Sequence, residues 1–232
     1  MPASKNRKPK SEITYKSTYE DVAINTGKFR NLGVYTSLLK PMLGQINALL
    51  THHSRVQLLR FDLHLPVMDY MPATSANLVV TKFFKQIKQD LSSPKWNKQI
   101  NVIHCWAREV GESENGHYHC YVGLSSTVRL GTFYGETPTH IWKLIYNRWK
   151  QLSGGSVRPS KRSCHVINRN NHNELSTAFF HLSYICKVRS KNFGTGEHHK
   201  RYSNSRLKYK TGTTALALDP KPEHEFFHAM LE

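Results

Sequence analysis

The hydrophobic pattern alternates between segments typical of strands and segments typical of helices, and this order constrains the fold more than any other feature. From residue 55 onwards the order is β-α-β-β-α-β-α, which is typical of a split-βαβ arrangement. We therefore predict an α+β, ferredoxin-like (RRM-like) fold in which helices flank an antiparallel central sheet. Asn77 is expected to be the N-cap of the second helix. The strands are expected at residues 55–65, 100–110, 117–126 and 163–170, and the helices at residues 36–52, 77–91, 138–152 and 173–189.

The charge balance is strongly basic and indicates a polyanionic partner. Lys and Arg number 33 against 16 Asp and Glu, which gives a formal net charge of +17 and a pI near 9.8. A net positive charge of that size attracts nucleic acid. The alternative explanations are a charged surface that keeps the protein soluble and non-specific adhesion to membranes. A hydrophobic content of 38% argues against a disordered chain.

The cysteines and the apolar runs bear on the cellular setting. The cysteines form no C-x-x-C pair, which argues against a zinc ribbon, and they lie among apolar residues, as core cysteines do. No secretory signal follows the basic start, and no apolar run is long enough to span a bilayer. We therefore expect a reduced cytoplasmic protein without a membrane partner. The cysteines are Cys105, Cys120, Cys164 and Cys186.

Composition divides the chain into a central domain and two basic ends. Residues 1–34 are expected to form a basic N-terminal arm, residues 35–192 the folded domain, and residues 193–232 a basic and aromatic C-terminal segment. From residue 187 to residue 210, eight Lys or Arg residues accompany one acidic residue, with aromatic residues between them. This mixture suits single-stranded nucleic acid, because cations contact phosphates and aromatic rings stack on bases. An exposed, solvated tail is the alternative.

His117 and His119 are candidate metal ligands, because residues two apart in a strand point to the same face. On its own, an H-x-H pair more often marks surface or hydrogen-bonded histidines. Glu109 ends the preceding strand, and a hairpin would bring its carboxylate beside His117. Two imidazoles and a carboxylate suit a divalent cation such as Mg²⁺ or Mn²⁺, with positions left for substrate. Glu112 and Glu114 in the hairpin loop are less favoured alternatives to Glu109.

A tyrosine and a lysine on the last predicted helix are candidates for catalysis. Tyr184 and Lys187 are expected to project together, on a stripe separate from the apolar face of that helix. Phe180 and Lys191 continue the stripe. A tyrosine phenol is a poor nucleophile at its free pKa, so it needs a metal ion that polarises the phosphate and a cation that neutralises developing charge. Taken alone, the pattern is better explained by an ordinary helix-surface tyrosine and lysine.

The carboxylate, the H-Y-H pair and the Y-I-C-K motif occur in that order along the predicted layout. This conjunction resembles the HUH superfamily of replication initiators and relaxases, in which two histidines flank a hydrophobic residue on a central strand and a later helix bears Y-x-x-K. The closest similarity is to the one-tyrosine proteins of the inovirus replication-protein group, found in phages and integrated elements. It covers roughly residues 55–206, and its specificity lies in residues 59–65 (LRFDLHL), 106–124 (WAREVGESENGHYHCYVGL) and 183–191 (SYICKVRSK).

The resemblance implies a role for each motif residue. The metal ligands would be His117 and His119 with Glu109 as the additional polar ligand. Tyr184 would be the nucleophile, and Lys187 corresponds to the lysine of the motif.

Further residues are expected to shape the site or to contact DNA. Arg60, Phe61 and Asp62 fall in the superfamily's first motif, which contributes mainly to sheet structure and DNA placement. Only one motif tyrosine is present, and Tyr202 is a remote candidate for a second. The sequence has no G-x-x-x-x-G-K-[ST] loop, so the helicase and the polymerase would be separate partners. The residues expected to bind DNA are Arg60, Arg189, Lys191, Lys200, Arg201, Arg206 and Lys208.

Together these features predict a metal-dependent, site-specific endonuclease that nicks single-stranded or locally melted DNA. It would stay joined to the new 5′ end through a phosphotyrosine, as in the initiation of rolling-circle replication. The expected setting is the cytoplasm of a bacterial host, with the gene on a phage or mobile element. One alternative is a phage-satellite or mobile-element nickase that cuts a competing phage genome. Others are a non-catalytic nucleic-acid-binding module and a metal hydrolase that uses water in place of tyrosine.

Overall fold

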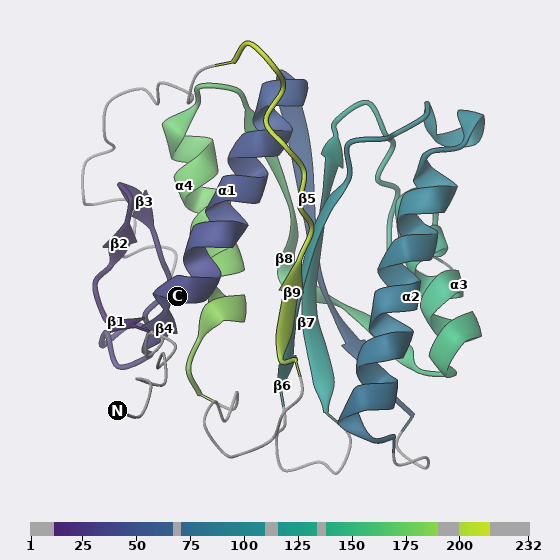
Figure 1. The fold of residues 1–232 in the computed structure, drawn as a ribbon, viewed down its shortest axis with the longest axis horizontal. Helices are drawn as coiled ribbons and strands as arrows, with labels where there is room; N and C mark the ends of the chain where they lie inside the picture. Colours follow the sequence, from purple (N-terminus) through teal and green to yellow (C-terminus); the bar gives the residue numbers. More distant parts are fainter. Residues whose placement is uncertain (1–11, 67–70, 110–115, 134–137, 190–199, 214–232) are drawn as a thin grey trace, which may run out of the picture.

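A five-stranded antiparallel sheet forms the centre of the protein (Figure 1). The computed structural model describes residues 12–66, 71–109, 116–133, 138–189 and 200–213. The strands of the sheet are β5 (Arg55–His64), β6 (Ile103–Glu109), β7 (His117–Ser125), β8 (Ser156–Asn168) and β9 (Tyr202–Asn204). They lie in the order β8-β5-β7-β6-β9, and every neighbouring pair is antiparallel.

The connectivity confirms the predicted α+β, ferredoxin-like arrangement. β5 and β6 run parallel to each other on either side of β7, because both pair antiparallel with it. Helix α2 (Ala73–Leu91) connects β5 to β6, and helix α3 (His140–Ser153) connects β7 to β8. This is a split βαβ unit, in which the crossing helix joins two strands that a third strand separates.

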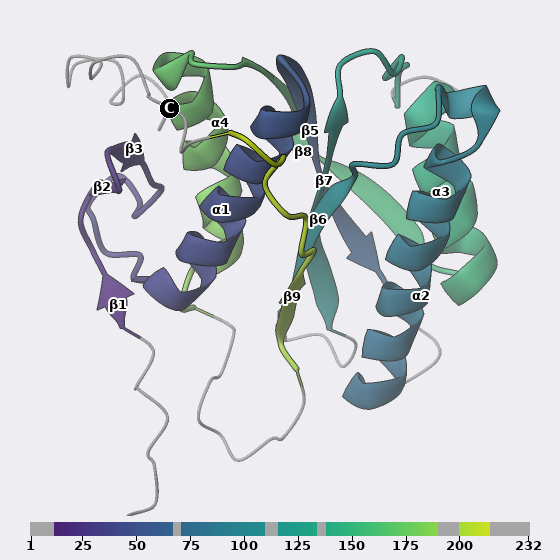
Figure 2. The same ribbon diagram turned by 45° about the horizontal axis from the view of Figure 1, so that its top comes forward.

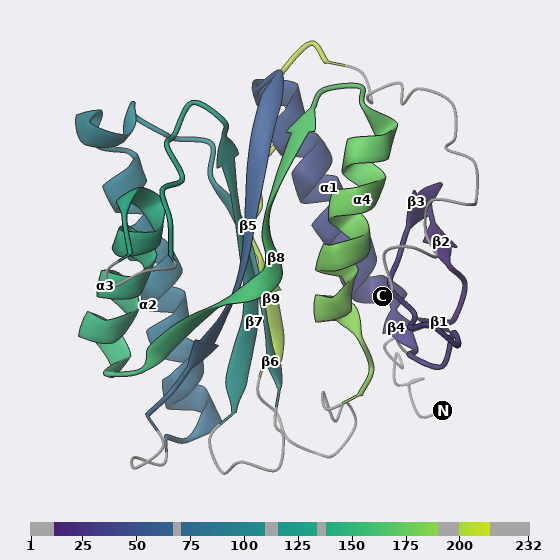
Figure 3. The ribbon, with the colours of Figure 1, turned by 180° about the vertical axis from the view of Figure 1, so that it is seen from behind.

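Helices cover both faces of the sheet, so the molecule has three layers (Figure 1, Figure 3). α2 and α3 cover one side, the α2/α3 face, while α1 (Thr36–His52) and α4 (His172–Ser183) cover the other, the α1/α4 face. Each face has its own core of buried apolar side chains. Aromatic rings contribute strongly to the α2/α3 core, where Phe83 contacts Phe61 and Trp149 edge to face.

Strand β5 supplies both cores and then becomes polar on one face. Phe61 belongs to the α2/α3 core and Leu58 to the α1/α4 core. Because side chains alternate along a strand, the residues that follow Leu58 on the α1/α4 face are Arg60, Asp62 and His64. On the α1/α4 face, the side chains of β5 are therefore apolar up to Leu58 and polar from Arg60 onwards.

The N-terminal segment is packed on the α1/α4 face. It contains the short strands β1 (Ile13–Thr14), β2 (Thr18–Tyr19), β3 (Val22–Ala23) and β4 (Val34–Tyr35), which pair β1 with β4 and β2 with β3. Figure 2 shows them beside α1 and α4. Val22, Ile24 and Val34 are buried in the α1/α4 core, so the expected division between arm and domain does not coincide with a break in packing. Residues 1–11, which carry the basic run, lie outside the described residues.

Helix α2 begins earlier than the sequence indicates. It starts at Ala73 with Pro72 as its N-cap, so the prediction that Asn77 caps it was wrong. The Asn77 side chain instead accepts a hydrogen bond from the hydroxyl of Tyr118 and donates one to the carbonyl of Lys200. Asn77 therefore ties α2 to β7 and to the C-terminal segment.

The last strand and the last helix also differ from their predicted bounds. β8 begins at Ser156, ahead of the predicted start at residue 163. The prediction missed the first half of the strand because that half is polar and has no apolar pattern. α4 ends at Ser183, where a 3-10 turn, η2 (Tyr184–Cys186), takes over, so the helix predicted to continue to residue 189 was wrong. The Ser183 hydroxyl donates to the carbonyl of Phe180, and such bonds favour helix ends. Phe180 is buried, so it does not belong to a surface stripe.

The described part of the C-terminal segment contains an edge strand, β9. β9 pairs with β6, and the amide group of Gln45 in α1 bonds both the N–H and the carbonyl of Leu207. The segment expected to hold DNA therefore also completes the sheet. Residues 193–199 and 214–232 of that segment lie outside the described residues.

The cysteines match the prediction of core thiols in part. Cys105, Cys120 and Cys186 are buried, Cys164 is half-buried, and none of the four forms a disulfide in the described part of the chain. Among the helices of the described residues, none has the length and apolar character needed to cross a bilayer.

Candidate functional site

A carboxylate and two imidazoles converge at one end of the β6–β7 hairpin. The strand register places Glu109 directly opposite His117, and His119 follows on the same face of β7. Oε2 of Glu109 lies 3.1 Å from Nε2 of His119 and 3.8 Å from Nε2 of His117. One ligand atom from each residue lies within 4.8 Å of the others, so this buried group could bind one metal ion. We call these three residues the metal-ligand group.

The donor atoms fit a divalent cation. Glu109 is 3% exposed and His119 is 6% exposed, so both lie in the low-dielectric interior. Nε2 of His119 is buried, and Oε2 of Glu109 lies 3.1 Å from it, so these two donor atoms are close enough to bind the same ion. Burial and the adjacent His119 lower the pKa of His117 to about 4, which leaves its imidazole neutral and able to donate a lone pair to a metal.

Asp62 orients one of the two imidazoles. It lies directly opposite His119 in the β5–β7 register, and its Oδ1 is 2.6 Å from Nδ1 of that ring. Burial acts to raise the pKa of Asp62, but the hydrogen bond and charge of His119 outweigh burial and hold this pKa below its ordinary value. For His119, burial acts to lower the pKa, whereas the bonds to Asp62 and Glu109 raise it overall. A carboxylate behind a histidine in this way fixes the ring and increases its basicity as a metal ligand.

Tyr184 and Lys187 lie beside the metal-ligand group, just beyond the end of α4. Nζ of Lys187 donates a 2.6 Å hydrogen bond to Oη of Tyr184 and lies 3.3 Å from Oε2 of Glu109. The rings of Tyr184 and His119 meet edge to face with their centres 5.8 Å apart. Lys187 is 8% exposed, so water screens its charge only weakly. The structure therefore brings both predicted catalytic residues to the predicted metal ligands.

The N-terminal segment holds the backbone that carries Lys187. Val34 forms an isolated antiparallel bridge with Lys187, and the N–H of Val188 donates to the carbonyl of Gly33 over 2.8 Å. The absence of a side chain at Gly33 leaves room for Ile13, because a Cβ there would come within 2.8 Å of the Ile13 side chain. Residues 1–34 were predicted to form an N-terminal arm outside the folded domain, so the support that this segment gives to Lys187 was not expected.

Arg60 packs against the ring of Tyr184. Its guanidinium carbon lies 4.9 Å from the ring centre, and its Nη1 donates a 2.8 Å hydrogen bond to the carbonyl of His181. Burial lowers the pKa of Arg60, while the charge of Asp62 opposes that effect. A guanidinium group stays charged in proteins, so Arg60 adds a second cation next to the phenol.

The other residues expected to bind DNA differ in exposure. Arg201 is 5% exposed, so its side chain has little surface to offer a phosphate. Its carbonyl accepts a hydrogen bond from the N–H of Arg108, which joins the segment to β6. The exposed ones are Arg189, Lys200, Arg206 and Lys208. Three residues named as candidates lie outside the described residues: Lys191, Glu112 and Glu114.

Strand register fixes the positions of Tyr202 and His64, two residues with rings near the site. Tyr202, the remote candidate for a second nucleophile, lies opposite Ala107 in β9 and packs against the α1/α4 core. His64 lies opposite His117, and their rings stack with centres 5.3 Å apart. Sequence reasoning missed His64 and the contact of Asp62 with His119. The available signal was a run of polar residues on one face of an otherwise apolar strand.

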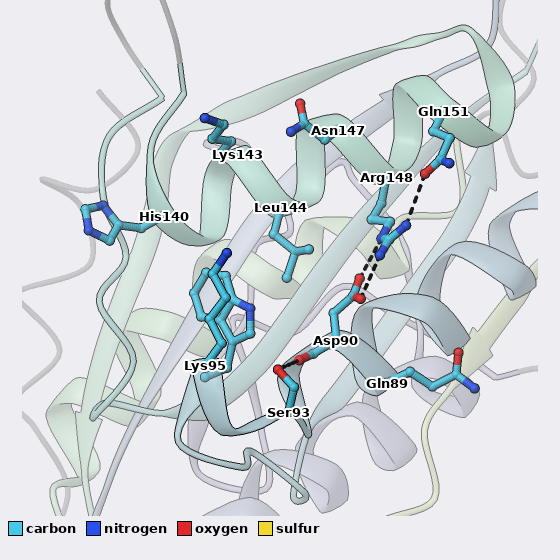
Figure 4. Close-up of a pocket in the computed structure, with 11 residues that line it drawn as sticks. Gln89, Asp90, Ser93, Lys95, His140, Lys143, Leu144, Asn147, Arg148 and Gln151 are labelled. Carbon is cyan, nitrogen blue, oxygen red and sulfur yellow. Dashed lines mark hydrogen bonds and ion pairs between the residues drawn. The ribbon is translucent and has the colours of Figure 1, made fainter.

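A separate cavity of about 790 Å³ lies on the α2/α3 face (Figure 4). It is bounded by the end of α2, by the 3-10 turn η1 (Pro94–Trp96) and by α3. Within it Arg148 donates two hydrogen bonds to the carboxylate of Asp90, over 2.6 and 2.7 Å, which neutralise the charge of Arg148. None of the metal-ligand group lines this cavity.

The fold and the site define an α+β domain with a ferredoxin-like sheet and a buried Glu/His/His group suited to a metal ion. The family model of the YagK/YfjJ C-terminal domain matches residues 18–201, most of the chain, and the protein belongs to this family. The match includes the metal-ligand group, Tyr184 and Lys187, and it begins within the N-terminal segment that packs on the α1/α4 face. No curated protein and no solved structure gives a significant match.

Proposed function

We propose that this protein is a metal-dependent endonuclease that nicks single-stranded DNA and becomes joined to the new 5′ end through Tyr184. The observation that carries the proposal is the position of Lys187, whose Nζ contacts both Oη of Tyr184 and Oε2 of Glu109. One cation thus lies within hydrogen-bonding reach of both the nucleophile and the group of metal ligands, an arrangement that suits phosphodiester transfer. The resemblance of the three motif segments to one-tyrosine HUH proteins supports the same assignment.

Each side chain has its own task in the proposed reaction. Glu109, His117 and His119 would hold a divalent ion, which supplies positive charge that polarises the scissile phosphate. Oη of Tyr184 attacks the phosphorus in line with the P–O3′ bond, which breaks to leave a 5′-phosphotyrosine and a free 3′-hydroxyl. Lys187 stabilises negative charge on the attacking oxygen. An ammonium group has no lone pair, so the phenol proton passes to water, and the departing 3′ oxygen takes up a proton.

The free 3′-hydroxyl points to rolling-circle initiation as the role that fits best. A polymerase can extend this hydroxyl, while a helicase as a separate partner would open the duplex. A net charge of +17 suits a DNA partner. The proposed setting is the cytoplasm of a bacterium that carries the encoding phage or mobile element.

A covalent-adduct assay tests the proposal. The full chain is incubated with a random-sequence pool of end-labelled single-stranded DNA and Mn²⁺ or Mg²⁺, and SDS-resistant protein–DNA adducts are resolved on a gel. We expect an adduct with the wild-type protein, none in EDTA and none with Tyr184→Phe. Tyr202→Phe is the matched control and should retain the adduct.

Each alternative gives a different pattern in this assay. Adduct formation that survives Tyr184→Phe would show that the nucleophile is assigned wrongly. Metal-dependent cleavage without any adduct would identify a hydrolase that uses water. Binding of the pool with neither cleavage nor adduct, in either metal, would identify a non-catalytic DNA-binding protein.

A further inference from the structure

Strand β8 has a pronounced bulge opposite Arg60, the residue that packs on the ring of Tyr184. Its pairing with β5 slips at Arg60, so residues 160–163 of β8 lie opposite that one residue. The hydroxyl of Ser160 donates to the carbonyl of Arg60, which anchors the bulge at its base. Bulges redirect side chains and are frequent next to active sites. This one carries two exposed cations, Lys161 and Arg162.

A continuous set of contacts joins the bulge to the candidate nucleophile. Nη1 of Arg162 lies 3.3 Å from Nε2 of His181, and the carbonyl of His181 accepts the hydrogen bond from Arg60. Arg60 in turn packs on the ring of Tyr184. His181 also stacks on His165, with ring centres 4.8 Å apart. Arg162 and the phenol therefore belong to one connected patch on the α1/α4 face, and the exposed Lys161 precedes Arg162 in the same bulge.

The patch is cationic and has no acidic partner at its outer end. Arg60, Lys161 and Arg162 form no ion pair with a carboxylate in the described part of the chain. Burial lowers the pKa of His181 to about 4, so its ring is neutral at pH 7 and accepts from Arg162, which can only donate. His181 thus holds the guanidinium without neutralising its charge.

The backbone of the bulge is strained, which argues for a selected geometry. Arg162 has a φ of +139°, in the region that favours glycine. Such a conformation costs free energy in a residue with a side chain, and it is concentrated at functional sites. Nε of Arg60 is also a buried donor without a partner among the described residues. The cation of Arg162 and the unsatisfied Nε donor of Arg60 are both suited to binding an anion.

We propose that Arg162 and Lys161 of the β8 bulge, together with Arg60, form a phosphate-binding subsite for the DNA strand that enters the Tyr184 site. This inference rests on the proposed function, because the ligand is the backbone of the strand to be cut. The subsite directs the strand along the β8 edge of the α1/α4 face. It binds phosphodiester groups by charge and by the fork of guanidinium donors, so it does not read base sequence.

The test measures binding separately from cutting. Affinity of the full chain for a fluorescein-labelled oligodeoxythymidylate is measured by anisotropy in EDTA, over a range of salt concentrations. The variants are Arg162→Ala, Lys161→Ala and Arg162→Lys, the last of which keeps the charge. Arg55→Ala is the matched control, because Arg55 is exposed on β5 and alternation places it on the opposite face. Lys143→Ala probes the cavity on the α2/α3 face.

We expect Arg162→Ala to weaken binding about tenfold, as the loss of one charge-assisted hydrogen bond does. The slope of log affinity against log salt should also fall by about 0.7, the value for one phosphate contact on a single strand. Arg162→Lys should keep the slope, and Arg55→Ala should change neither quantity. Thermal melting checks that each variant is folded.

Two results would overturn the subsite. In one, Arg162→Ala and Lys161→Ala bind like Arg55→Ala. In the other, Lys143→Ala weakens binding while the bulge variants do not, which would place the strand on the α2/α3 face. The adduct assay reports on the nuclease chemistry independently, so wild-type protein that binds through the bulge and yields no adduct would refute only the proposed function.

Discussion

Lys187 donates a 2.6 Å hydrogen bond to the phenol oxygen of Tyr184 across the 3-10 turn that follows α4. In a 3-10 turn, side chains three residues apart eclipse each other, so this geometry aligns the two groups more closely than an α-helix does. The same ammonium group lies 3.3 Å from Oε2 of Glu109. The phenol, the ammonium and the metal-ligand group therefore form one connected unit.

Replacement of Lys187 should slow adduct formation. Lys187→Met keeps the length of the side chain but removes the charge beside Oη of Tyr184, and we expect the rate to fall about 10²–10³-fold, as for the loss of one preorganised electrostatic contact. Single-turnover adduct formation with excess protein measures this rate. Lys150→Met, an exposed residue of α3, is the control. An unchanged rate in folded Lys187→Met would contradict the assigned role.

Asp62→Asn should weaken metal binding without removing a ligand. The amide of the new side chain would carry no negative charge to stabilise the Nδ1–H of His119, so Nε2 of this ring becomes a weaker metal ligand. We expect a 10- to 100-fold loss of affinity for the metal ion. Calorimetric titration with Mn²⁺ measures it. Asp90→Asn removes a carboxylate on the α2/α3 face and should leave Mn²⁺ affinity unchanged. Equal affinities for Asp62→Asn and wild type would show that this contact does not tune the metal site.

Stability should fall in mild acid because of His104, a half-buried residue of β6. Burial, and then the charges of Lys88 and Lys200, lower the pKa of this ring to about 4. In the unfolded chain the ring binds a proton near pH 6.5, so between pH 6.5 and 4 the unfolded state binds more protons and is favoured. The loss in the free energy of unfolding should reach up to roughly 3 kcal/mol by pH 4.

His104→Phe isolates that contribution. Phenylalanine keeps the stacking on Phe84, where the ring centres are 4.5 Å apart, but cannot bind a proton. Urea unfolding at several pH values should show a shallower fall for this variant than for wild type. His140→Asn, at an exposed site, should follow the wild-type curve. Parallel curves for His104→Phe and wild type would contradict the prediction.

The N-terminal segment should contribute strongly to stability. Ile24 is 1% exposed in the α1/α4 core, so Ile24→Ala should cost about 2–5 kcal/mol in the free energy of unfolding. Phe29 is 81% exposed, and Phe29→Ala should change it by less than about 0.5 kcal/mol. Urea unfolding followed by tryptophan fluorescence compares the two. Similar values for both variants would mean that the segment is not part of the cooperative fold.

The sequence was most informative where a hydrophobic pattern repeats over many residues, or where two residues in contact are close in the chain. Helix α1 was predicted with the bounds it has, since its apolar residues recur over several turns. The prediction that Glu109 meets His117 was also correct, because a hairpin fixes the pairing of its two strands. By contrast, the strands of residues 12–35 have two residues each, too few to show any period.

The order of elements from β5 to α4, the split-βαβ class and the local set of Glu109, His117 and His119 could be predicted from the sequence alone. Each of these follows from periodicity or from neighbours joined by a short connection. Only the tertiary structure decided that Asp62 faces His119, that the chain near Gly33 supports Lys187, and that α4 gives way to a 3-10 turn at Tyr184. These relationships depend on strand register and on packing between distant segments, and neither leaves a periodic signal in the chain.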